Sequence, residues 1–335
     1  MNALRFEKTG PLDNLTLSNV PKPVPTPGEA LVRVKAAGIN GSDSAGIQGW
    51  LPFVTTPRIA GRDFSGEVVE VTEGSDPSAQ EWVGAEVWGT GGDRGFVVDG
   101  SFAEYITVPI SALSRKPKSL DHVKAGSITL PWLCAWIAVE TLANVKKGDN
   151  VVIIGARGAI GSGAAQLCKD RGATVFGTYR SLANVQPPAF LTPIELSSKT
   201  SIREAIAQHG LQNKIDVLLD CAGYEDPFND AIFTMTPKGS GRIVVMAVHR
   251  SDGLFTVDLR TLYAKALTLK GLKSSILGPA EVKKVLDELA AKLDSGDLEG
   301  PKEVKTVAMS DMGAVKGALT EVLTRSSSVR SVIVP

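Results

Sequence analysis

Cysteine and histidine are both scarce in this chain, with three residues of each among 335. Cys134, Cys168 and Cys221 are far apart and form no C-x-x-C pair, so the sequence supports neither a disulfide framework nor a zinc clip. The histidines form no H-x-x-x-H cluster, which argues against a metal site built from ordinary His and Cys ligands. Few, dispersed cysteines are typical of a reducing compartment, and we therefore expect a cytoplasmic protein.

Net charge and long apolar runs are absent as well. The chain has 36 acidic and 36 basic residues and no Lys/Arg cluster, so we expect no nucleic-acid partner. No run of about 20 apolar residues occurs, which predicts no membrane span. Met1–Arg5 leads directly into a polar segment, so no signal peptide is expected either. The length predicts two domains, each with a substantial core.

The stretch from Val151 to Val175, VVIIGARGAIGSGAAQLCKDRGATV, has the pattern of a βαβ unit. Its β-branched apolar start, Val151–Ile154, predicts a buried parallel strand. A glycine-rich turn follows, and then a segment with small residues on its early turns predicts a helix that ends at Gly172. A second strand is expected from Ala173.

The glycine-rich turn has the chemistry of a phosphate-binding site. Gly158 lets the backbone approach a pyrophosphate, and Gly161 lets the helix pack close to the strand. The free N–H groups at the helix start would point at the anion. The usual fingerprint is G-x-G-x-x-G, from which this turn departs at its first position. The candidate cofactor-binding residues here are Ala156, Arg157, Gly158, Ala159, Ile160 and Gly161; the alternative is a tight turn without a ligand.

The end of the second strand indicates which dinucleotide binds. An NAD site usually has an acid about 20 residues past the glycines, whereas this chain reads Thr178-Tyr179-Arg180-Ser181. Arg180 could bind a 2′-phosphate through charge-assisted hydrogen bonds, with Thr178 or Ser181 adding a hydroxyl and Tyr179 stacking on adenine. We interpret this as an NADPH site. The alternative is that Arg180 is a solvated surface charge.

The segments on either side of this unit differ in their periodicity. Up to about Ala125, short strand patterns such as Ala30–Ile39 are separated by glycines, and the Pro-rich link Pro21–Glu29 fits neither a helix nor a central strand. This predicts a small antiparallel, barrel-like domain. After Arg180, strands and helices alternate, which predicts a parallel, doubly wound sheet. Its expected elements are helices at Ile202–Gln208 and Ala231–Met235 and strands at Asp216–Asp220 and Arg242–Ala247.

Proline and glycine limit the remaining elements. The stretch Ser181–Ser198 contains three prolines and is expected to hold only a short helix. From Pro279 an amphipathic pattern predicts a helix that stops at Gly296. A further helix is expected at Met312–Leu323 and a final strand at Val329–Val334.

Several strings, in the same order along the chain, give it a specific resemblance to a known family. They are PKPVPTPGEALVRVKAAGIN at Pro21–Asn40, RIAGRDFSGEVVEV at Arg58–Val71, GSFAEYITVP at Gly100–Pro109, the stretch Leu130–Ala173, IDVLLDCAG at Ile215–Gly223, GRIVVMA at Gly241–Ala247 and LRTLYAKALTLKGL at Leu259–Leu272. Together they resemble the medium-chain dehydrogenase/reductase superfamily over nearly the whole chain. Within it, the chain is similar to the zinc-free quinone oxidoreductase (zeta-crystallin-like) branch.

The resemblance implies an α/β protein with a GroES-like β-barrel catalytic domain and a Rossmann domain inserted into it. We expect the discontinuous catalytic domain at residues 1–127 and 271–335 and the dinucleotide-binding domain at residues 128–270. In relatives the Rossmann sheets often pair across a two-fold axis. We expect a strand near Leu254–Val257, and a homodimer that pairs this strand, or the segment before Leu267, is therefore an open option.

Zinc-dependent members of the superfamily use a Cys, a His followed by an acid, and a later Cys around the catalytic metal. The matching positions in this chain are Asn40, Arg62 and a position near Leu130, none of which is a usual zinc ligand. The four-cysteine structural zinc lobe is absent too. The resemblance therefore implies a protein without zinc.

Without a metal, a substrate carbonyl must be polarised by hydrogen bonds. The candidate catalytic residues are Asn40, Ser42 and Arg62. Asn40 could donate from its amide, or bind the nicotinamide amide, or only stabilise its loop. Ser42 matches the hydroxyl that relays protons in zinc alcohol dehydrogenases. Arg62 could face a developing oxyanion, or form a salt bridge with Asp63 or Asp43.

The other candidates follow from strand ends and from the resemblance. Cys134 would line the cofactor site or simply pack in the core, and Trp50 would be a substrate-pocket wall or a stray loop aromatic. In an open α/β sheet the ligand lies outside the carboxyl ends of the strands. This nominates Ala222 with Gly223, and Met246 and Ala247 with Val248, for the cofactor. Leu272 with Lys273 would close the domain seam, and Leu272 is a further cofactor candidate. Arg325 could meet the adenosine phosphate, although Arg330 competes for that role.

The sequence therefore predicts an NADPH-dependent reductase that delivers hydride to a quinone or to the C=C bond of an α,β-unsaturated carbonyl. The proton that an enone needs would come from water, Ser42 or Tyr105, and Tyr105 would lie at the substrate. One alternative is a zinc-free ketone or alcohol oxidoreductase. Another is a protein that binds NADPH with little turnover.

Overall fold

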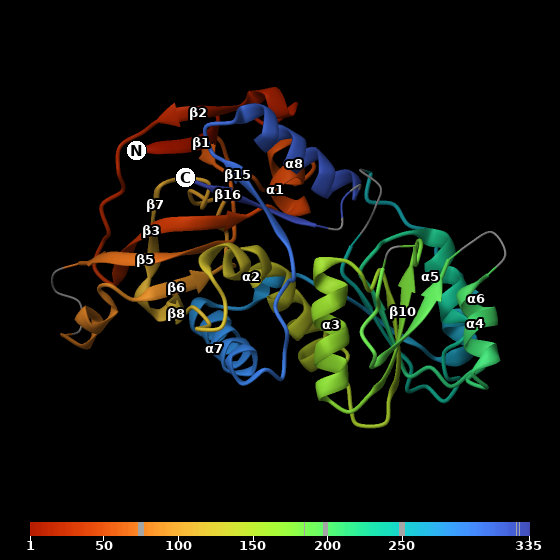
Figure 1. Ribbon diagram of the computed structural model, residues 1–335. Coiled ribbons are helices and arrows are strands. Elements are labelled where there is room, and N and C mark those ends of the chain that lie inside the picture. Colours follow the sequence, from red (N-terminus) through yellow and green to blue (C-terminus); the bar gives the residue numbers. More distant parts are fainter. Residues whose placement is uncertain (73–76, 184, 197–199, 248–251, 326, 328) are drawn as a thin grey trace. The chain divides into compact units, whose positions relative to one another are not determined.

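The computed structural model describes residues 1–72, 77–183, 185–196, 200–247, 252–325, 327 and 329–335. The chain divides into two compact units (Figure 1). Unit 1 comprises Met1–Leu133 and Ser274–Pro335, and unit 2 comprises Cys134–Lys273. Each unit has its own sheets and its own hydrophobic core.

Unit 1 is mainly antiparallel β-structure, with a three-stranded sheet in the order β2-β1-β4 and a larger sheet built around β3. The alternating segment predicted as a half-buried strand is β3, whose apolar side chains enter the core. The strands are β1 (Asn2–Phe6), β2 (Leu15–Asn19), β3 (Glu29–Gly38), β4 (Arg58–Ile59), β5 (Phe64–Val71), β6 (Glu86–Gly89), β7 (Tyr105–Pro109), β8 (Ser114–Arg115), β15 (Val304–Ala308) and β16 (Arg330–Val334).

The helices of unit 1 pack against its strands and against one another. They are α1 (Gly41–Ile47), the first part of α2 (His122–Trp136), α7 (Pro279–Ser295) and α8 (Met312–Thr324), with 3-10 turns at Leu12–Asn14, Pro77–Trp82, Ile110–Ala112 and Ser274–Ile276. Helix α7 ends where predicted, because Gly296 takes a left-handed conformation with φ of 82°. Its buried face packs on the sheet, and Ser114 donates to Asp287 at 2.7 Å.

Unit 2 contains a six-stranded parallel sheet in the order β11-β10-β9-β12-β13-β14. Numbered within the unit, this is the 3-2-1-4-5-6 order of a doubly wound dinucleotide-binding sheet. The prediction of a parallel, doubly wound sheet is therefore confirmed. The strands are β9 (Asn150–Ile154), β10 (Thr174–Tyr179), β11 (Leu191–Glu195), β12 (Val217–Asp220), β13 (Arg242–Val245) and β14 (Thr268–Gly271).

Helices cover both faces of the sheet of unit 2. In Figure 1, α3 lies on one side, and α4, α5 and α6 lie on the other. Their bounds are α3 (Ala159–Asp170), α4 (Ile202–Gln208), α5 (Glu225–Ile232) and α6 (Leu259–Lys265), and the α2 helix continues in this unit as a π-helical turn at Ile137–Leu142. With both faces covered, β9 and β12 are almost wholly buried, as their apolar sequences require.

Three local predictions for unit 2 were wrong. The helix expected at Ala231–Met235 begins earlier, at Glu225, because Pro227 is tolerated in a first helical turn. The described part of Ser181–Ser198 holds no helix; it holds the strand β11, which pairs with β10 in parallel. The described segment Leu254–Val257 forms no strand, and the edge of the sheet is β14.

One helical stretch, His122–Leu142, is long and apolar enough to span a membrane by length and composition alone. Of its most apolar 18-residue window, 78% is buried within the protein. That burial is typical of a core helix in a folded domain.

Candidate active site

The glycine-rich turn joins β9 to α3, and its geometry requires glycine at two positions. Gly155 has φ of 81°, a conformation that L side chains rarely adopt. At Gly161 a Cβ atom would lie 2.3 Å from the carbonyl oxygen of Gly155, so only glycine lets α3 begin this close to the turn. The close approach predicted for Gly161 is therefore present.

The start of α3 presents backbone donors to this end of the sheet. Gly158 is the N-cap residue, Ala159 and Ile160 form the first helical positions, and Arg157 is exposed beside them. The first N–H groups of any helix lack an acceptor within the helix, and together with the helix dipole they favour an anion. The turn can therefore hold a phosphate or pyrophosphate through its backbone.

The four residues at the end of β10 have different environments. The Thr178 hydroxyl is buried and accepts a hydrogen bond from the Gly155 N–H at 2.9 Å, so it supports the glycine turn. Tyr179 is buried, and burial raises the pKa of its phenol. Arg180 and Ser181 are exposed. Of these four residues only Arg180 and Ser181 are exposed, and the Ser181 hydroxyl accepts a hydrogen bond from the Ala183 N–H at 3.1 Å.

The carboxyl ends of β12, β13 and β14 supply the other predicted cofactor residues. Ala222 and Gly223 both donate to the buried Asp220 carboxylate at 2.9 Å, which fixes the turn after β12. Ala222 lies beside the glycine turn: a Cβ atom added at Gly155 would be 3.3 Å from the Cβ atom of Ala222. Met246, Ala247 and Leu272 are half-buried at the same edge of the sheet, whereas Val248 lies outside the described residues.

In unit 1, Asn40 is held on every side by charged groups. Its backbone N–H donates to Asp43 at 2.8 Å, and its amide Nδ2 donates to Asp63 at 3.0 Å. Arg330 in turn donates to its Oδ1 at 2.9 Å. These contacts fix the orientation of the amide and leave one Nδ2 hydrogen uncommitted. These contacts agree with the interpretation that Asn40 stabilises its loop. The second Nδ2 hydrogen is the donor that remains for a ligand.

Two aspartates are buried beside Asn40. Burial, and then the nearby charge of Asp63, raises the pKa of the Asp43 carboxyl to about 7. Burial also raises the pKa of Asp63, which accepts a further hydrogen bond from the Leu130 N–H at 3.0 Å. Asp43 Oδ1, Ser42 Oγ and Thr129 Oγ1 are buried and have no hydrogen-bond partner. Unsatisfied polar atoms of this kind are uncommon in a folded core.

Arg62 is a buried charge in this cluster. The residue is 4% exposed, and its guanidinium lies 4.8 Å from the centre of the Phe96 ring. Its hydrogen bonds, to Gly92 O at 3.3 Å and Ser274 Oγ at 3.5 Å, are long and go to neutral groups, and its Nε has no partner. Arg62 therefore makes no direct ion pair with Asp43 or Asp63, contrary to the alternative interpretation of its role.

The resemblance places Asn40 and Arg62 at the first two zinc-ligand positions. An amide and a buried guanidinium are not the Cys and His donors that zinc usually takes, and a guanidinium repels a cation. Among the residues that the structure describes, no group of three or more His, Cys, Asp or Glu side chains is arranged to hold a metal ion.

The remaining predicted residues are distributed over both units. Trp50 is an exposed residue of the loop after α1. Tyr105 lies on β7 with the ammonium of Lys22 4.4 Å from its ring, and no hydrogen bond in the described chain joins it to Asn40 or Arg62. Cys134 is buried in α2. Arg325 caps α8 in a left-handed conformation, whereas Arg330 is bound to Asn40 and to Ser127 O.

Sequence reasoning missed two residues: Asp63, in the polar cluster around Asn40, and Glu195, beside the Arg180 turn. Asp63 was considered only as a partner for Arg62, although it holds Asn40. Glu195 ends β11, pairs in register with Tyr179 and accepts from the Leu182 N–H at 3.0 Å, so an acid lies beside the Arg180 turn. Because no strand was predicted in this stretch, no signal in the sequence indicated the position of Glu195.

A glycine turn at the switch point of a 3-2-1-4-5-6 sheet, next in the chain to a GroES-like barrel, defines a dinucleotide-dependent oxidoreductase with two domains. Two family models match: the alcohol dehydrogenase GroES-like domain over residues 26–118 and the zinc-binding dehydrogenase over residues 159–291. A zinc-type alcohol dehydrogenase-like protein of Schizosaccharomyces pombe is 32% identical over 301 residues, which cover 88% of this chain and 86% of the relative.

Two further similar proteins are quinone oxidoreductases. That of Sus scrofa is 27% identical over 310 residues, which cover 88% of this chain and 86% of the relative. The crystal structure of the quinone oxidoreductase of Pseudomonas syringae pv. Tomato DC3000 has a TM-score of 0.84 at 22% identity and covers 100% of this chain and 99% of its own. The chain belongs to the medium-chain dehydrogenase/reductase superfamily, in its quinone-oxidoreductase-like branch, as its motifs predicted.

Proposed function

We propose that this oxidoreductase uses NADPH to reduce a quinone, or the C=C bond of an α,β-unsaturated carbonyl, without zinc. The observation that carries the proposal is the environment of Arg62. A buried guanidinium with only long hydrogen bonds to neutral atoms occupies a position where metal-dependent members of the family have a ligand.

The residues of unit 2 fit a dinucleotide. The backbone of residues 156–161 would bind the pyrophosphate at the start of α3. Arg180 and Ser181 are exposed at the end of β10, where a 2′-phosphate would lie. Thr178 would stabilise the glycine turn through its hydrogen bond from the Gly155 N–H. Tyr179, Cys134, Ala222, Met246, Ala247 and Leu272 would supply the remaining contacts in this unit. Arg325, in unit 1, stays a candidate for the adenosine phosphate. When bound, NADPH supplies the hydride.

The polar cluster of unit 1 would stabilise the negative charge that develops on the acceptor oxygen. Arg62 offers a fixed positive charge, and Asn40 offers the one amide hydrogen that Asp63 leaves free. Such preorganised donors are worth most in a buried site, where no solvent has to reorganise. Ser42, with its unpartnered hydroxyl, would supply the proton that an enone requires, and water serves as the alternative.

The test is NADPH oxidation with separate acceptors after treatment with a chelator. We expect turnover with 9,10-phenanthrenequinone, 1,4-benzoquinone or trans-2-hexenal, and little with a simple ketone. Reduction of the ketone would favour the second candidate, a zinc-free ketone or alcohol oxidoreductase. Tight NADPH binding without turnover on any acceptor would favour a binding protein, and loss of activity with the chelator would contradict zinc independence.

Location and assembly complete the proposal. We infer a cytoplasmic protein whose partner is a small carbonyl or quinone substrate, with no nucleic-acid or membrane partner. The balanced charge and the dispersed cysteines, which form no disulfide in the described part of the chain, support this inference. A homodimer is also proposed, because the edge strand β14 and the helix before it expose apolar side chains.

A further inference from the structure

Residues 179–183, the turn that carries Arg180, are attached to strand β11 on both sides of that arginine. Tyr179 pairs in register with Glu195, and the N–H of the residue after Glu195 donates to Tyr179 O at 2.8 Å. Further along the turn, the Leu182 N–H donates to the Glu195 carboxylate at 3.0 Å. The end of β11 therefore determines where the exposed side chains of the Arg180 turn lie.

No helix supports this turn in the described part of the connection to β11, although parallel strands are usually joined by one. Inside the turn, Ser181 Oγ accepts from the Ala183 N–H at 3.1 Å, and the Val185 N–H donates to Leu182 O at 3.0 Å. These contacts join near neighbours in the chain, so they shape the turn without attaching it to the sheet. Glu195 adds an attachment to the sheet at the far end of the turn.

The charge of Glu195 allows two roles with opposite consequences. An acid near the adenosine ribose is typical of NAD sites, where it accepts from a ribose hydroxyl, and its charge would oppose a 2′-phosphate. Glu195 is exposed, but its Oε1 already accepts a backbone N–H, and a carboxylate with such a donor forms a charge-assisted hydrogen bond. The geometry therefore favours a role in holding the turn, to which the negative charge itself is not required.

We propose that Glu195 is a positioning residue for cofactor selection: through the Leu182 N–H it holds Arg180 and Ser181 in place for the 2′-phosphate of NADPH. This inference rests on the proposed NADPH-dependent function, because it names the residue that prepares the same cofactor site. A turn that is held before the cofactor arrives lowers the entropic cost of binding. NADH has no 2′-phosphate, so its binding does not depend on the position of these two side chains.

The experiment compares Glu195→Gln with Glu195→Ala in the full chain, with the Kd for NADPH and for NADH measured by direct titration. Both variants lack the negative charge, and only glutamine keeps an oxygen that accepts the Leu182 N–H, so their difference isolates the hydrogen bond. We expect the NADPH Kd of Glu195→Ala to be about fivefold to tenfold above that of Glu195→Gln. The NADPH Kd of Glu195→Gln should equal that of wild type or be lower, because a repulsive charge is removed. The NADH Kd should change less than about twofold in both variants.

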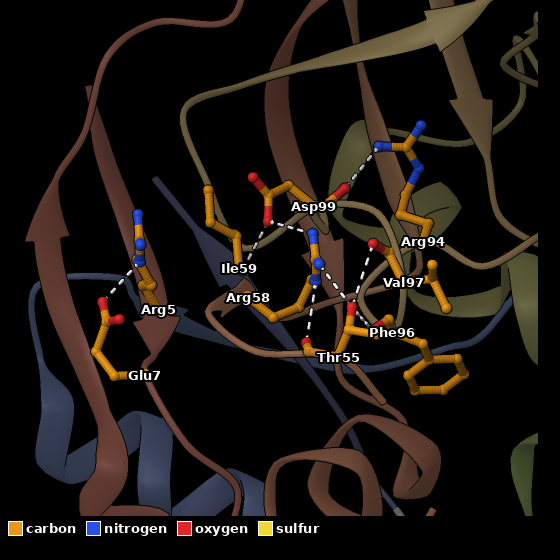
Figure 2. A network of polar contacts seen from close by, with 9 residues as sticks. All are labelled: Arg5, Glu7, Thr55, Arg58, Ile59, Arg94, Phe96, Val97 and Asp99. Atoms are coloured by element: carbon orange, nitrogen blue, oxygen red, sulfur yellow. Dashed lines mark hydrogen bonds and ion pairs between the residues drawn. The ribbon is translucent and has the colours of Figure 1, made fainter. Parts of the chain in front are cut away.

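Figure 2 shows a contact of the same kind in unit 1, which provides the matched control. There the Asp99 carboxylate accepts from the Ile59 N–H at 3.1 Å and from Arg58 at 3.0 Å. Asp99→Asn and Asp99→Ala repeat the two substitutions at an exposed acid that holds a backbone N–H outside the dinucleotide-binding unit. We expect the ratio of the NADPH Kd to the NADH Kd to keep its wild-type value in both.

Equal NADPH affinities of the two Glu195 variants would overturn the inference, and a selective loss of NADPH binding in Arg180→Ala would then leave the proposed cofactor intact. Weaker NADH binding by Glu195→Gln would also overturn it, because the acid would then bind a ribose hydroxyl directly. If wild type binds NADPH no more tightly than NADH, the inference and the proposed cofactor are both wrong. Titration needs no acceptor, so the absence of turnover on every acceptor would contradict the reductase function alone.

Discussion

Arg180 is the residue on which the choice of cofactor depends. It is exposed at the carboxyl end of β10, and hydrogen bonds from a guanidinium to a phosphate are worth about 1.5–3 kcal/mol each. We expect Arg180→Ala to weaken NADPH binding about tenfold to a hundredfold and NADH binding less than threefold, as measured by direct titration. Lys238→Ala, which removes another exposed cation of unit 2, is the control. Equal losses for both cofactors would rule out a contact with the 2′-phosphate.

The roles of residues that depend on their neighbours in the sequence could be predicted. The roles of residues that depend on contacts with distant parts of the chain could not. Gly155 needs a left-handed backbone and Gly161 allows a close approach of the helix, so both requirements are local and their spacing already indicated the turn. The Arg330–Asn40 hydrogen bond joins residues 290 positions apart, and no periodicity encodes that pairing. Glu195 was missed because its position beside Tyr179 depends on the register of β10 and β11.

At the scale of elements, His122 joins the start of α2 to the sheet of unit 1. Its Nδ1 lies 2.8 Å from Ser65 Oγ and its Nε2 lies 3.0 Å from Glu86, with Lys116 also paired to Glu86. Burial lowers the pKa of His122, although Glu86 opposes the shift. The folded protein therefore takes up this proton less readily than the unfolded chain. The contribution of His122 to the free energy of unfolding is fully present above the ordinary histidine pKa of about 6.5. It is lost as the pH falls below that value.

We expect His122→Gln to reduce this acid sensitivity. Between pH 7.5 and pH 5.5 the wild-type melting temperature should fall further than that of the variant, by a difference on the order of 1–2 °C. His209→Gln, at an exposed histidine of unit 2, should behave like wild type. If the melting temperature of the His122→Gln variant falls as much as that of wild type over this pH range, protonation of His122 is not coupled to unfolding.

The order of elements was easier to predict from the sequence than their boundaries. Long periodic segments such as α3 and α7 were predicted nearly in full, because one apolar face fixes each helix. β11 was missed because Pro188 and Pro193 suggested irregular structure, although proline is tolerated at a strand with a single neighbour. α5 was misplaced because its first turn is acidic and contains Pro227, which obscures the apolar pattern that starts at Phe228.

At the scale of the whole molecule, the open question is assembly. Strand β14 has one neighbour in its sheet, and all four of its residues are exposed, so its outer backbone groups are free to pair with another strand. Tyr263 and Leu259 of the adjoining α6 are 87% and 72% exposed, and Leu269 of β14 is exposed too. An apolar edge of this kind is stable in water when a second copy covers it.

We therefore expect a homodimer in which β14 pairs with its counterpart across a two-fold axis. Light scattering after size exclusion should give about twice the chain mass of 35.3 kDa. Leu269→Lys places a charge on the strand edge and should shift the protein to monomer, because charged edges resist strand pairing. Val24→Lys, at an exposed apolar position of unit 1, should leave the mass unchanged. If wild type is monomeric, or if both variants remain dimers, β14 is not the interface, and the exposed face of α6 must serve another partner or none.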